Sequence, residues 1–248
     1  MKYAVISDIH AHLAALQAVL RDAQEQGCTH TACLGDIVGY YNKPKECVDL
    51  IRQMNIPCVK GNHDEYCSSE EALEGFKPPA PEMVAWTRNQ LAEGDRRWLG
   101  GLPLILNVSG FTIVHGSLDG PERWGYVFDK LAAAASLAWQ KTPVCFFGHT
   151  HVAVAFVRDT MVRGGTFSKF RVEPGKQYFI NVGSVGQPRD GTKQATYVTY
   201  DLDEGLIELR RVNSAPPEPP PDGGESVPWP TDPRGPRPHL RSLAEPEE

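Results

Sequence analysis

Gly61-Asn62-His63-Asp64 closely follows an apolar run at residues 56–59 (IPCV), and this junction is the most informative stretch of the sequence. A run of this kind predicts a buried strand, and a glycine after it lets the chain turn sharply. The junction therefore places an amide oxygen, an imidazole and a carboxylate together at the edge of a sheet.

Two earlier apolar runs end in the same way. Residues 3–6 (YAVI) lead into Asp8 and His10, and residues 31–34 (TACL) lead into Gly35-Asp36. In an open α/β sheet, ligands bind just outside the carboxyl ends of the strands. Three consecutive strands that finish in Asp, His or Asn therefore predict one site, and these side chains indicate a metal site.

The composition limits the classes of function. The chain has 248 residues, of which 41% are hydrophobic and 23% charged, as expected for one soluble domain with a substantial core. A net charge of -6 argues against binding to nucleic acid or to an anionic membrane. There is no membrane-length apolar stretch, no signal peptide and no CxxC pair among six cysteines, so we expect a cytoplasmic protein with reduced thiols.

The order of apolar patterns predicts the fold class. An apolar stripe predicts a helix from Leu13 to Ala23, and Asn42 and Pro44 open a second helix, which gives a β-α-β-α-β start with parallel strands. Further helices are expected at residues 81–92, 95–99 and 129–140, and strands at 104–108, 111–114, 144–147, 152–157, 177–182, 195–202 and 206–212. This order predicts an α/β fold in which two mixed sheets pack face to face with helices outside, a four-layer α/β/β/α sandwich.

The end of the chain differs from the rest. Eleven of the 21 prolines follow Asn213, and few apolar residues accompany them. Such a segment cannot bury enough surface to offset its ordering entropy. We expect a domain at residues 1–212 and a disordered or extended acidic tail at 213–248, in which Trp229 is the one residue large enough to anchor it. Residues 68–80 are expected to form a surface excursion.

The candidate metal ligands share one property, which is that each lies at the predicted end of an apolar run. In chain order they are Asp8, His10, Asp36, Asn62, His115, His149 and His151, with His63 beside them. Oxygen and imidazole ligands without thiolates favour Mn²⁺, Fe or Zn²⁺. Seven ligands exceed the needs of one tetrahedral ion and fit two ions that share a carboxylate. Two ions about 3.5–4 Å apart can clamp both oxygens of a phosphoryl transfer and generate a metal-bound hydroxide near neutral pH.

These segments resemble the calcineurin-like metallophosphoesterases over about residues 1–200. The matching motifs are Asp8-x-His10, Gly35-Asp36, Gly61-Asn62-His63-Asp64, His115-Gly116 and Gly148-His149-Thr150-His151. Residues 181–190 (NVGSVGQPRD) are similar to the late loop of the small bacterial and archaeal phosphodiesterase-like branch.

The resemblance implies a ligand set for two divalent ions, with Mn²⁺ expected and Fe, Zn²⁺ or Ni²⁺ as alternatives. The first ion would be held by Asp8, His10, Asp36 and His151, and the second by Asp36, Asn62, His115 and His149. Asp36 would then be the bridge, and Asn62 would also lie next to the substrate. The remaining imidazole, that of His63, would be free to protonate the leaving oxygen.

The sequence also departs from the protein-phosphatase branch. That branch has an Asp and an Arg where this chain has Gly39 and Tyr40, which weakens an assignment as a protein phosphatase. Arg189 is the best candidate for a phosphate contact, because a guanidinium presents a fork of donors, although an exposed arginine in a turn explains it equally well. His12 lies near the site at a helix start, and its role is open. Tyr40, Tyr41 and Trp124 could stack on a nucleobase or could simply pack.

We therefore expect an enzyme that hydrolyses a phosphodiester or a nucleotide phosphoanhydride. A metal-bridging hydroxide would attack phosphorus, Asp36 would hold both ions, and His63 would supply the proton. The partner would be a small phosphorylated substrate such as a nucleotide. The alternatives are a Ser/Thr or Tyr protein phosphatase, a dinucleoside tetraphosphate hydrolase, and a catalytically weak binding scaffold of the same fold. The intact ligand set argues against the scaffold.

Overall fold

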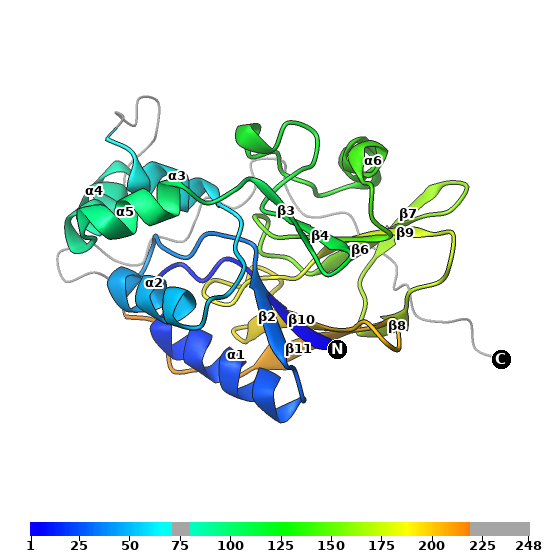
Figure 1. Cartoon of the computed structure of the whole chain (residues 1–248), viewed down its shortest axis with the longest axis horizontal. Helices are drawn as coiled ribbons and strands as arrows, with labels where there is room; N and C mark the ends of the chain where they lie inside the picture. Colours follow the sequence, from blue (N-terminus) through cyan, green and yellow to red (C-terminus); the bar gives the residue numbers. More distant parts are fainter. Residues whose placement is uncertain (71–79, 219–248) are drawn as a thin grey trace.

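The computed structural model describes residues 1–70 and 80–218 (Figure 1). Most of the expected surface segment at 68–80 and most of the expected tail at 213–248, including Trp229, lie outside these residues. The helices are α1 (Leu13–Glu25), α2 (Pro44–Gln53), α3 (Asn62–Ser68), α4 (Ala80–Gln90), α5 (Glu93–Gly100), the 3₁₀ turn η1 (Pro121–Arg123) and α6 (Lys130–Trp139). The strands are β1 (Lys2–Ile6), β2 (His30–Cys33), β3 (Ile105–Val108), β4 (Phe111–Val114), β5 (Val144–Phe147), β6 (Val154–Arg158), β7 (Val162–Gly165), β8 (Lys169–Arg171), β9 (Gln177–Asn181), β10 (Ala195–Asp201) and β11 (Leu206–Val212).

Two mixed sheets form the centre of the molecule, which confirms the predicted fold class. One sheet has the order β2-β1-β10-β11-β8, and the other has the order β3-β4-β5-β9-β6-β7. Helices α1 and α2 pack on the outer face of the first sheet, and α6 packs on the outer face of the second (Figure 1). Each sheet takes strands from both halves of the chain, so the two sheets do not correspond to the two halves.

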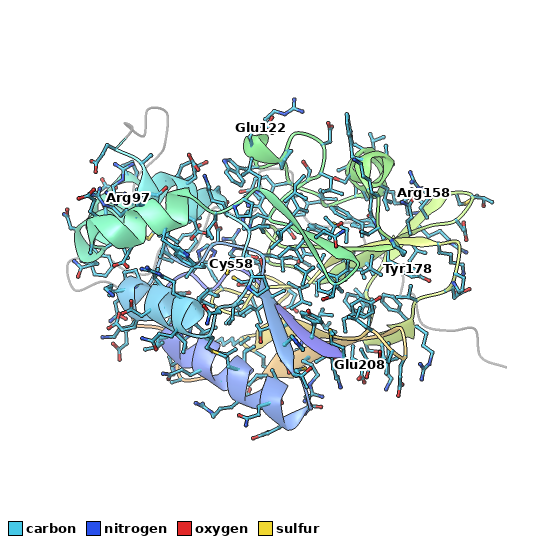
Figure 2. All side chains as sticks on the ribbon, viewed as in Figure 1. Cys58, Arg97, Glu122, Arg158, Tyr178 and Glu208 are labelled. Carbon is cyan, nitrogen blue, oxygen red and sulfur yellow. The ribbon has the colours of Figure 1, made fainter. Side chains whose placement is uncertain are left out.

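The apolar run of β1 is continuous because both faces of the strand are buried. Tyr3 and Val5 point into the core between the two sheets, whereas Ala4 and Ile6 point into the core beneath the helices. Side chains fill the space between the sheets (Figure 2). Burial of one side chain such as Val5 contributes about 1.5–3 kcal/mol, so the sandwich is stabilised mainly by these two apolar layers.

The predicted strand at residues 56–59 is wrong in its extent. Cys58 makes only an isolated parallel bridge with Cys33, although the segment does run beside β2. Cys33 N donates to Pro57 O at 2.9 Å, and Val59 N donates to Cys33 O at 3.1 Å. Proline has no N–H to donate, so Pro57 cannot extend the ladder. The segment still delivers Gly61 to the same sheet edge.

Four elements were not predicted from the sequence: α3, the 3₁₀ turn η1, β7 and β8. Gly61-Asn62-His63-Asp64 opens the helix α3 directly, with Gly61 as its N-cap and Asp64 Oδ2 accepting from Gly61 N at 3.0 Å. Strands β7 and β8 were also not predicted, because one is short and the other contains two glycines. By contrast, the hairpin around Ser109-Gly110 is confirmed, with Val108 opposite Phe111.

The loops that follow β1, β2, β4 and β5 meet at one edge of the sandwich. Strand β1 is parallel to β2, and β4 is parallel to β5, so their carboxyl ends point the same way within each pair. Gly148 N donates to His115 O at 2.9 Å, which ties the loops after β4 and β5. Val185 N donates to Ser7 O at 2.9 Å and brings the loop after β9 to the same place. After β11 the chain also returns to this side, where Asn42 Nδ2 donates to Glu218 Oε2 at 2.9 Å.

Candidate metal centre

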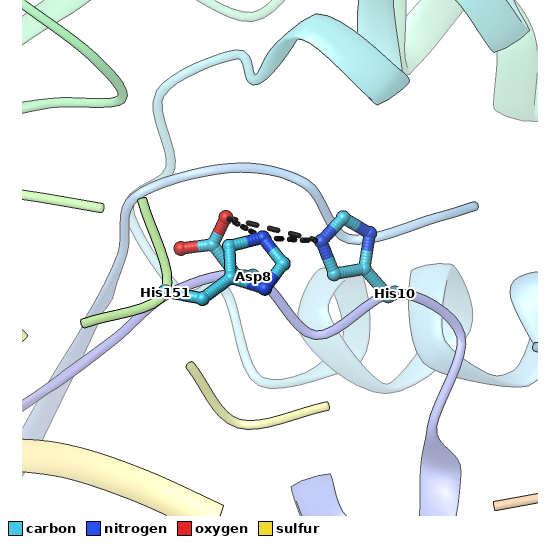
Figure 3. Close-up of side chains that lie close together, drawn as sticks. All are labelled: Asp8, His10 and His151. Atoms are coloured by element: carbon cyan, nitrogen blue, oxygen red, sulfur yellow. Dashed lines mark hydrogen bonds and ion pairs between the residues drawn. The ribbon is translucent and has the colours of Figure 1, made fainter. Parts of the chain in front are cut away.

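One cluster of possible ligands joins the loops after β1 and β5. Asp8, His10 and His151 are buried and their ligand atoms lie within 4.8 Å of one another (Figure 3). His151 Nε2 is 3.2 Å from Asp8 Oδ1 and 3.1 Å from His10 Nε2. These three residues form the first cluster, and all three belong to the predicted first metal site.

A second cluster joins the loops after β2, β4 and β5. Asp36, His115 and His149 are likewise buried with their ligand atoms within 4.8 Å of one another. His115 Nε2 is 3.3 Å from Asp36 Oδ2 and 3.2 Å from His149 Nδ1. Asn62 Oδ1 lies 3.1 Å from the same His115 nitrogen, so the amide belongs to this second cluster.

Asp36 lies between the two clusters. Its Oδ2 is 3.3 Å from His115 Nε2 in the second cluster and 3.7 Å from His10 Nε2 in the first. Its Oδ1 accepts from His63 N at 2.9 Å, which leaves Oδ2 directed at both groups of imidazoles. The fold therefore brings all seven predicted ligands into one place, with the proposed bridging carboxylate in the middle.

Each of the four imidazoles proposed as ligands is oriented by a main-chain carbonyl group. One ring nitrogen of each donates to the carbonyl oxygen, and the other nitrogen points into the site. The four hydrogen bonds are His10 Nδ1 to Val38 O at 3.3 Å, His115 Nδ1 to Leu34 O at 2.8 Å, His149 Nε2 to Trp124 O at 2.9 Å and His151 Nδ1 to Gln187 O at 2.6 Å. A hydrogen bond of this kind fixes the tautomer and the ring orientation of a metal-binding histidine.

The inward-facing nitrogens fit a metal ion. A carbonyl oxygen can only accept, so the nitrogen next to it carries the proton in each neutral ring, and the inward nitrogen presents a lone pair. In the pair His10–His151 the two inward nitrogens lie 3.1 Å apart, and two lone pairs at this distance repel unless a cation or a proton lies between them. Burial lowers the pKa of His115, but Asp36 outweighs burial and raises it to about 10, so without metal its Nε2 carries a proton 3.2 Å from His149 Nδ1, which a bound metal ion would replace. The residues present are therefore suited to hold divalent ions.

The charge of the two carboxylates also favours cations. Burial alone raises the pKa values of Asp8 and Asp36, but neighbouring imidazoles, His151 for Asp8 and His115 for Asp36, hold both below their usual range. Burial lowers the pKa of His149 to about 3, with His115 acting in the same direction. Both carboxyl groups are therefore ionised near neutral pH, and His149 is neutral, as metal ligands must be.

The backbone at the ligands adopts an unusual conformation. Asp8, His10, Asp36, His149 and His151 all have left-handed φ angles, between 50° and 67°. Each such residue costs on the order of 1–3 kcal/mol when it is not glycine. Strain of this kind persists only where the surroundings fix it, and five of the ten non-glycine residues with a positive φ in the described chain are proposed ligands.

Two glycines leave room for the carboxylates of Asp36 and Asp8, which lie directly against the glycine backbone. A Cβ on Gly61 would lie 2.1 Å from Asp36 Oδ1, and a Cβ on Gly148 would lie 2.5 Å from Asp8 Oδ2. No side chain fits at either position without moving a carboxylate. The glycines of the Gly61-Asn62-His63-Asp64 and Gly148-His149-Thr150-His151 segments therefore serve the site through their lack of a side chain.

Asp64 supports the loop that carries Asp36, a role that sequence reasoning missed. Its Oδ2 accepts from Asp36 N at 2.8 Å, and its Oδ1 accepts from Ile37 N at 2.9 Å and Val38 N at 3.3 Å. Burial, together with the charge of Asp36, raises the pKa of Asp64 to about 7. The signal in the sequence was its position three residues after the glycine N-cap, where an acidic side chain bonds back to the helix start.

His63 differs from the four ligand histidines. It is buried, and its ring lies 4.8 Å from that of His10 between centroids. Within residues 1–70 and 80–218, its Nδ1 has no hydrogen-bond partner and no carbonyl group orients it. His63 also lies close enough to His10 and Asp36 to share a cation with them, so geometry places it beside the metal cluster.

Arg189 lies at the rim of the site. Its Nη2 donates to Gln187 Oε1 at 2.6 Å, and its guanidinium also forms a hydrogen bond with the Tyr40 hydroxyl. Its charge is among the causes that lower the pKa values of His10 and His63, after the larger effect of burial. The guanidinium therefore lies near the metal cluster on a partly buried side chain, and the predicted phosphate contact remains a proposal.

The other residues singled out from the sequence have different surroundings. His12 Nδ1 accepts from Ala15 N at 3.3 Å, so this side chain caps α1, and its ring packs on the buried Tyr41. Trp124 orients His149 through its carbonyl group. The ring stacked on His149, at 4.0 Å between centroids, is that of Tyr126, which is 40% exposed and which sequence reasoning missed.

Comparison with known proteins identifies the class. The calcineurin-like phosphoesterase superfamily domain matches residues 1–205. A metallophosphoesterase from Sphaerobacter thermophilus has 37% sequence identity and a TM-score of 0.74, with 87% of this chain and 89% of that chain covered. A hypothetical protein from Pyrococcus horikoshii has 18% identity and a TM-score of 0.70, covering 86% and 88%, and so shares the fold.

A curated relative agrees with the structural matches. An uncharacterized protein from Methanocaldococcus jannaschii is 37% identical over 215 residues, which cover 84% of this chain and 86% of the relative. The chain belongs to the calcineurin-like phosphoesterase superfamily. It is a metallophosphoesterase, a class of enzyme that hydrolyses phosphoester bonds with divalent metal ions. In the part of the chain that the structure describes, no helix is long and apolar enough to cross a bilayer.

Proposed function

We propose that this metallophosphoesterase uses two divalent ions to hydrolyse a phosphodiester or an internal nucleotide phosphoanhydride. The observation that carries the proposal is the position of Asp36, whose Oδ2 lies 3.3 Å from His115 of one cluster and 3.7 Å from His10 of the other. A single carboxylate oxygen directed at two sets of imidazoles is the arrangement that two neighbouring ions require.

We propose that each of the two clusters holds one ion. Asp8, His10 and His151 would hold one ion, and Asn62, His115 and His149 the other, with Asp36 shared by both. Bound divalent ions supply Lewis acidity, which activates a water molecule and offsets negative charge on the phosphoryl oxygens. Oxygen and imidazole ligands without thiolates suit Mn²⁺, Fe or Zn²⁺. Of these we propose Mn²⁺, with Fe, Zn²⁺ or Ni²⁺ as the alternatives.

His63 would supply the proton to the leaving oxygen. Its lack of an orienting carbonyl group sets it apart from the four ligand histidines, and its ring lies beside His10 at the cluster. Burial lowers the pKa of His63, and the negative charge of a bound phosphate group acts in the opposite direction and favours the protonated ring. General acid catalysis by such a ring is worth about 10²–10⁴ in rate.

The charge of the site supports a diester or an internal anhydride. A phosphate monoester is a dianion near neutral pH and benefits from fixed cations beside the metals. At this site Arg189 is the guanidinium whose charge acts on His10 and His63, and it is already bonded to Gln187 and Tyr40. A diester carries less charge per phosphorus, so two ions offset more of it.

A substrate panel with defined metals tests this proposal. The panel contains an aryl diester, an aryl monoester, a cyclic nucleotide, a dinucleoside polyphosphate and a phosphopeptide, each assayed with Mn²⁺, Zn²⁺ and Ni²⁺. We expect the highest kcat/KM for a diester or for the dinucleoside polyphosphate. A consistent preference for the phosphopeptide across metals contradicts the proposal and favours a protein phosphatase.

We also propose a cytoplasmic location. All six cysteines are free, and five of them are buried, as expected in a reducing compartment. Cell fractionation followed by thiol labelling under denaturing conditions tests this. Recovery of the protein in the cytoplasmic fraction with six labelled thiols supports it, and recovery outside the cell contradicts it.

A further inference from the structure

The imidazole of His63 is held without a hydrogen bond to its Nδ1 atom. This nitrogen is buried and has no partner in residues 1–70 and 80–218, whereas each ligand histidine uses one ring nitrogen to bond a carbonyl group. A ring that must deliver a proton still needs a fixed orientation, because misplacement by about 1 Å can cost 10²-fold in rate. Some other contact must therefore restrict the rotation of His63.

Gly39 explains why no side chain bonds to that nitrogen from the loop after β2. A Cβ built on Gly39 would lie 2.5 Å from His63 Nδ1, and the residue has a φ of +101°. Both the space and the backbone conformation exclude a side chain at this position. An orienting carboxylate at residue 39 is thus incompatible with the observed position of the ring.

Tyr40 fills the position next to the ring. Its centroid lies 4.7 Å from that of His63 with an angle of 48° between the planes, and 4.5 Å from that of His10 at 68°. Its backbone has a left-handed φ of 50°, inside a turn in which Tyr41 N donates to Gly39 O at 2.7 Å. The strained turn therefore places the phenol ring against His63 and His10 together.

The outer end of Tyr40 is also fixed. Its hydroxyl forms a hydrogen bond with the guanidinium of Arg189, and Arg189 N donates to His151 O at 3.1 Å. The phenol ring is thus anchored at its backbone by the turn and at its hydroxyl by the loop after β9. A ring held at both ends can restrict the imidazole that packs against it.

We propose that Tyr40 is a positioning residue for His63, which orients the imidazole by ring packing in place of a hydrogen bond to Nδ1. This inference rests on the proposed role of His63 as proton donor. Tyr40 does not contact the reacting atoms in this account, and its effect on turnover passes through His63. The hydroxyl contributes by holding the phenol ring, so its removal has a smaller effect than removal of the ring.

A double-mutant cycle tests the proposal. The metal-loaded variants are Tyr40→Leu, Tyr40→Phe, His63→Ala and the double variant Tyr40→Leu/His63→Ala, assayed on aryl diesters with good and poor leaving groups. We expect Tyr40→Leu to lower kcat by about 10–10²-fold for poor leaving groups, by less for good ones, and to change KM little. Tyr40→Phe should retain most of the activity. In the His63→Ala background, Tyr40→Leu should not lower kcat any further.

Tyr200→Leu is the matched control for a loss of stability alone. Tyr200 is buried in the core between the sheets, where it packs on Phe111, and its loss should lower the Tm without changing the leaving-group dependence. Bound metal measured on every variant should stay as in the unmodified protein. A leaving-group dependence altered in the control as in Tyr40→Leu would assign the effect to general destabilisation and overturn the proposal.

A measurement without turnover separates this inference from the role of His63. Histidine ¹⁵N spectra of the metal-free protein should show one sharp set of His63 signals, which broaden or split in Tyr40→Leu. Unchanged His63 signals, or an equal cost of Tyr40→Leu with and without His63, would overturn the positioning role. If His63→Ala itself loses no activity, His63 is not the proton donor. The spectra still show in that case whether Tyr40 restricts the rotation of the His63 ring.

Discussion

His10 and His151 face each other through their Nε2 atoms, which lie 3.1 Å apart. Each ring donates from its Nδ1 to a main-chain carbonyl group, to Val38 and Gln187 respectively. When both rings are neutral, the two facing nitrogens both present lone pairs, which repel. A metal ion bound against both nitrogens, or a proton on one of them, removes this repulsion, so the contact favours the binding of a cation at this edge of the sandwich.

Replacement of His63 should separate proton donation from metal binding. We expect His63→Ala to keep its metal ions but to lose about 10²–10⁴ in kcat, the usual range for a general acid. The loss should shrink for substrates with good leaving groups, since these need less protonation. Metal analysis and a leaving-group series measure the two effects. An equal loss for good and poor leaving groups would mean that His63 stabilises charge on the phosphate instead.

Replacement of Asp64 should loosen the loop that carries Asp36. In Asp64→Asn one of the two acceptor oxygens becomes an amide N–H₂ group, which faces the N–H groups of Asp36 or Ile37. A buried donor without an acceptor costs about 1–3 kcal/mol, and loss of such support weakens metal binding by about 10–100-fold. Urea unfolding of the metal-free protein and a Mn²⁺ titration measure these changes. Unchanged values in both would show that Asp64 does not organise the loop.

Asp22 should make stability depend on pH. Its carboxylate accepts from the Tyr197 hydroxyl at 2.6 Å and from Arg210 Nη2 at 3.0 Å, which joins α1 to β10 and β11. Burial alone raises the pKa of Asp22, but the hydrogen bonds from Arg210 and Tyr197 outweigh burial and lower it. The stabilisation is therefore present above the unfolded pKa of about 4 and is lost as the pH falls through the lower folded value.

Unfolding free energies across pH test the role of Asp22. Asp22→Asn should be less stable than the unmodified protein by about 1 kcal/mol at pH 7, and the difference should vanish at acid pH. The control is Asp49→Asn, which removes only an exposed pair with Lys45 and should change stability by less than about 0.5 kcal/mol. A difference between Asp22→Asn and the unmodified protein that persists unchanged at acid pH would show that charge is not its origin.

Deletion of residues 219–248 should leave the chemistry intact. Every proposed ligand, together with His63 and Arg189, lies between residues 8 and 189. The described chain ends at Glu218, which bonds to Asn42 in the loop between β2 and α2, and this contact is retained in the deletion. We expect turnover and bound metal to be unchanged. Loss of turnover in a deletion variant that remains folded by circular dichroism would mean that the tail takes part in the site.

The clustering of the proposed ligands could be predicted from the sequence because their placement depends on local order. Apolar runs such as β1 and β5 end in Asp8 and His149, and parallel strands bring such ends together whatever the details of packing. The four-layer fold followed from the same runs for the same reason. The strand expected at residues 56–59 is reduced to an isolated bridge, because Pro57 has no N–H group with which to continue the ladder. An apolar pattern counts proline as one more apolar residue and so does not reveal this limit.

The partners of the ligands could not be predicted in this way. The carbonyl groups that orient the histidines belong to Val38, Leu34, Trp124 and Gln187, whose side chains play no part in these bonds. A carbonyl group is present in every residue, so no residue type marks it in the sequence. The packing of Tyr40 on His63 likewise depends on a left-handed turn, which becomes visible only in three dimensions.

A metal titration that follows turnover shows whether activity depends on two ions shared by Asp36. Metal-free protein is titrated with Mn²⁺, and the bound ions per chain are measured by equilibrium dialysis alongside activity on an aryl diester. We expect no activity without metal and full activity at two ions per chain. Asp36→Asn should weaken the binding of both ions, because this carboxylate lies between the two clusters. Full activity with a single bound ion, or loss of only one ion in Asp36→Asn, would contradict the proposed pair of ions shared by Asp36.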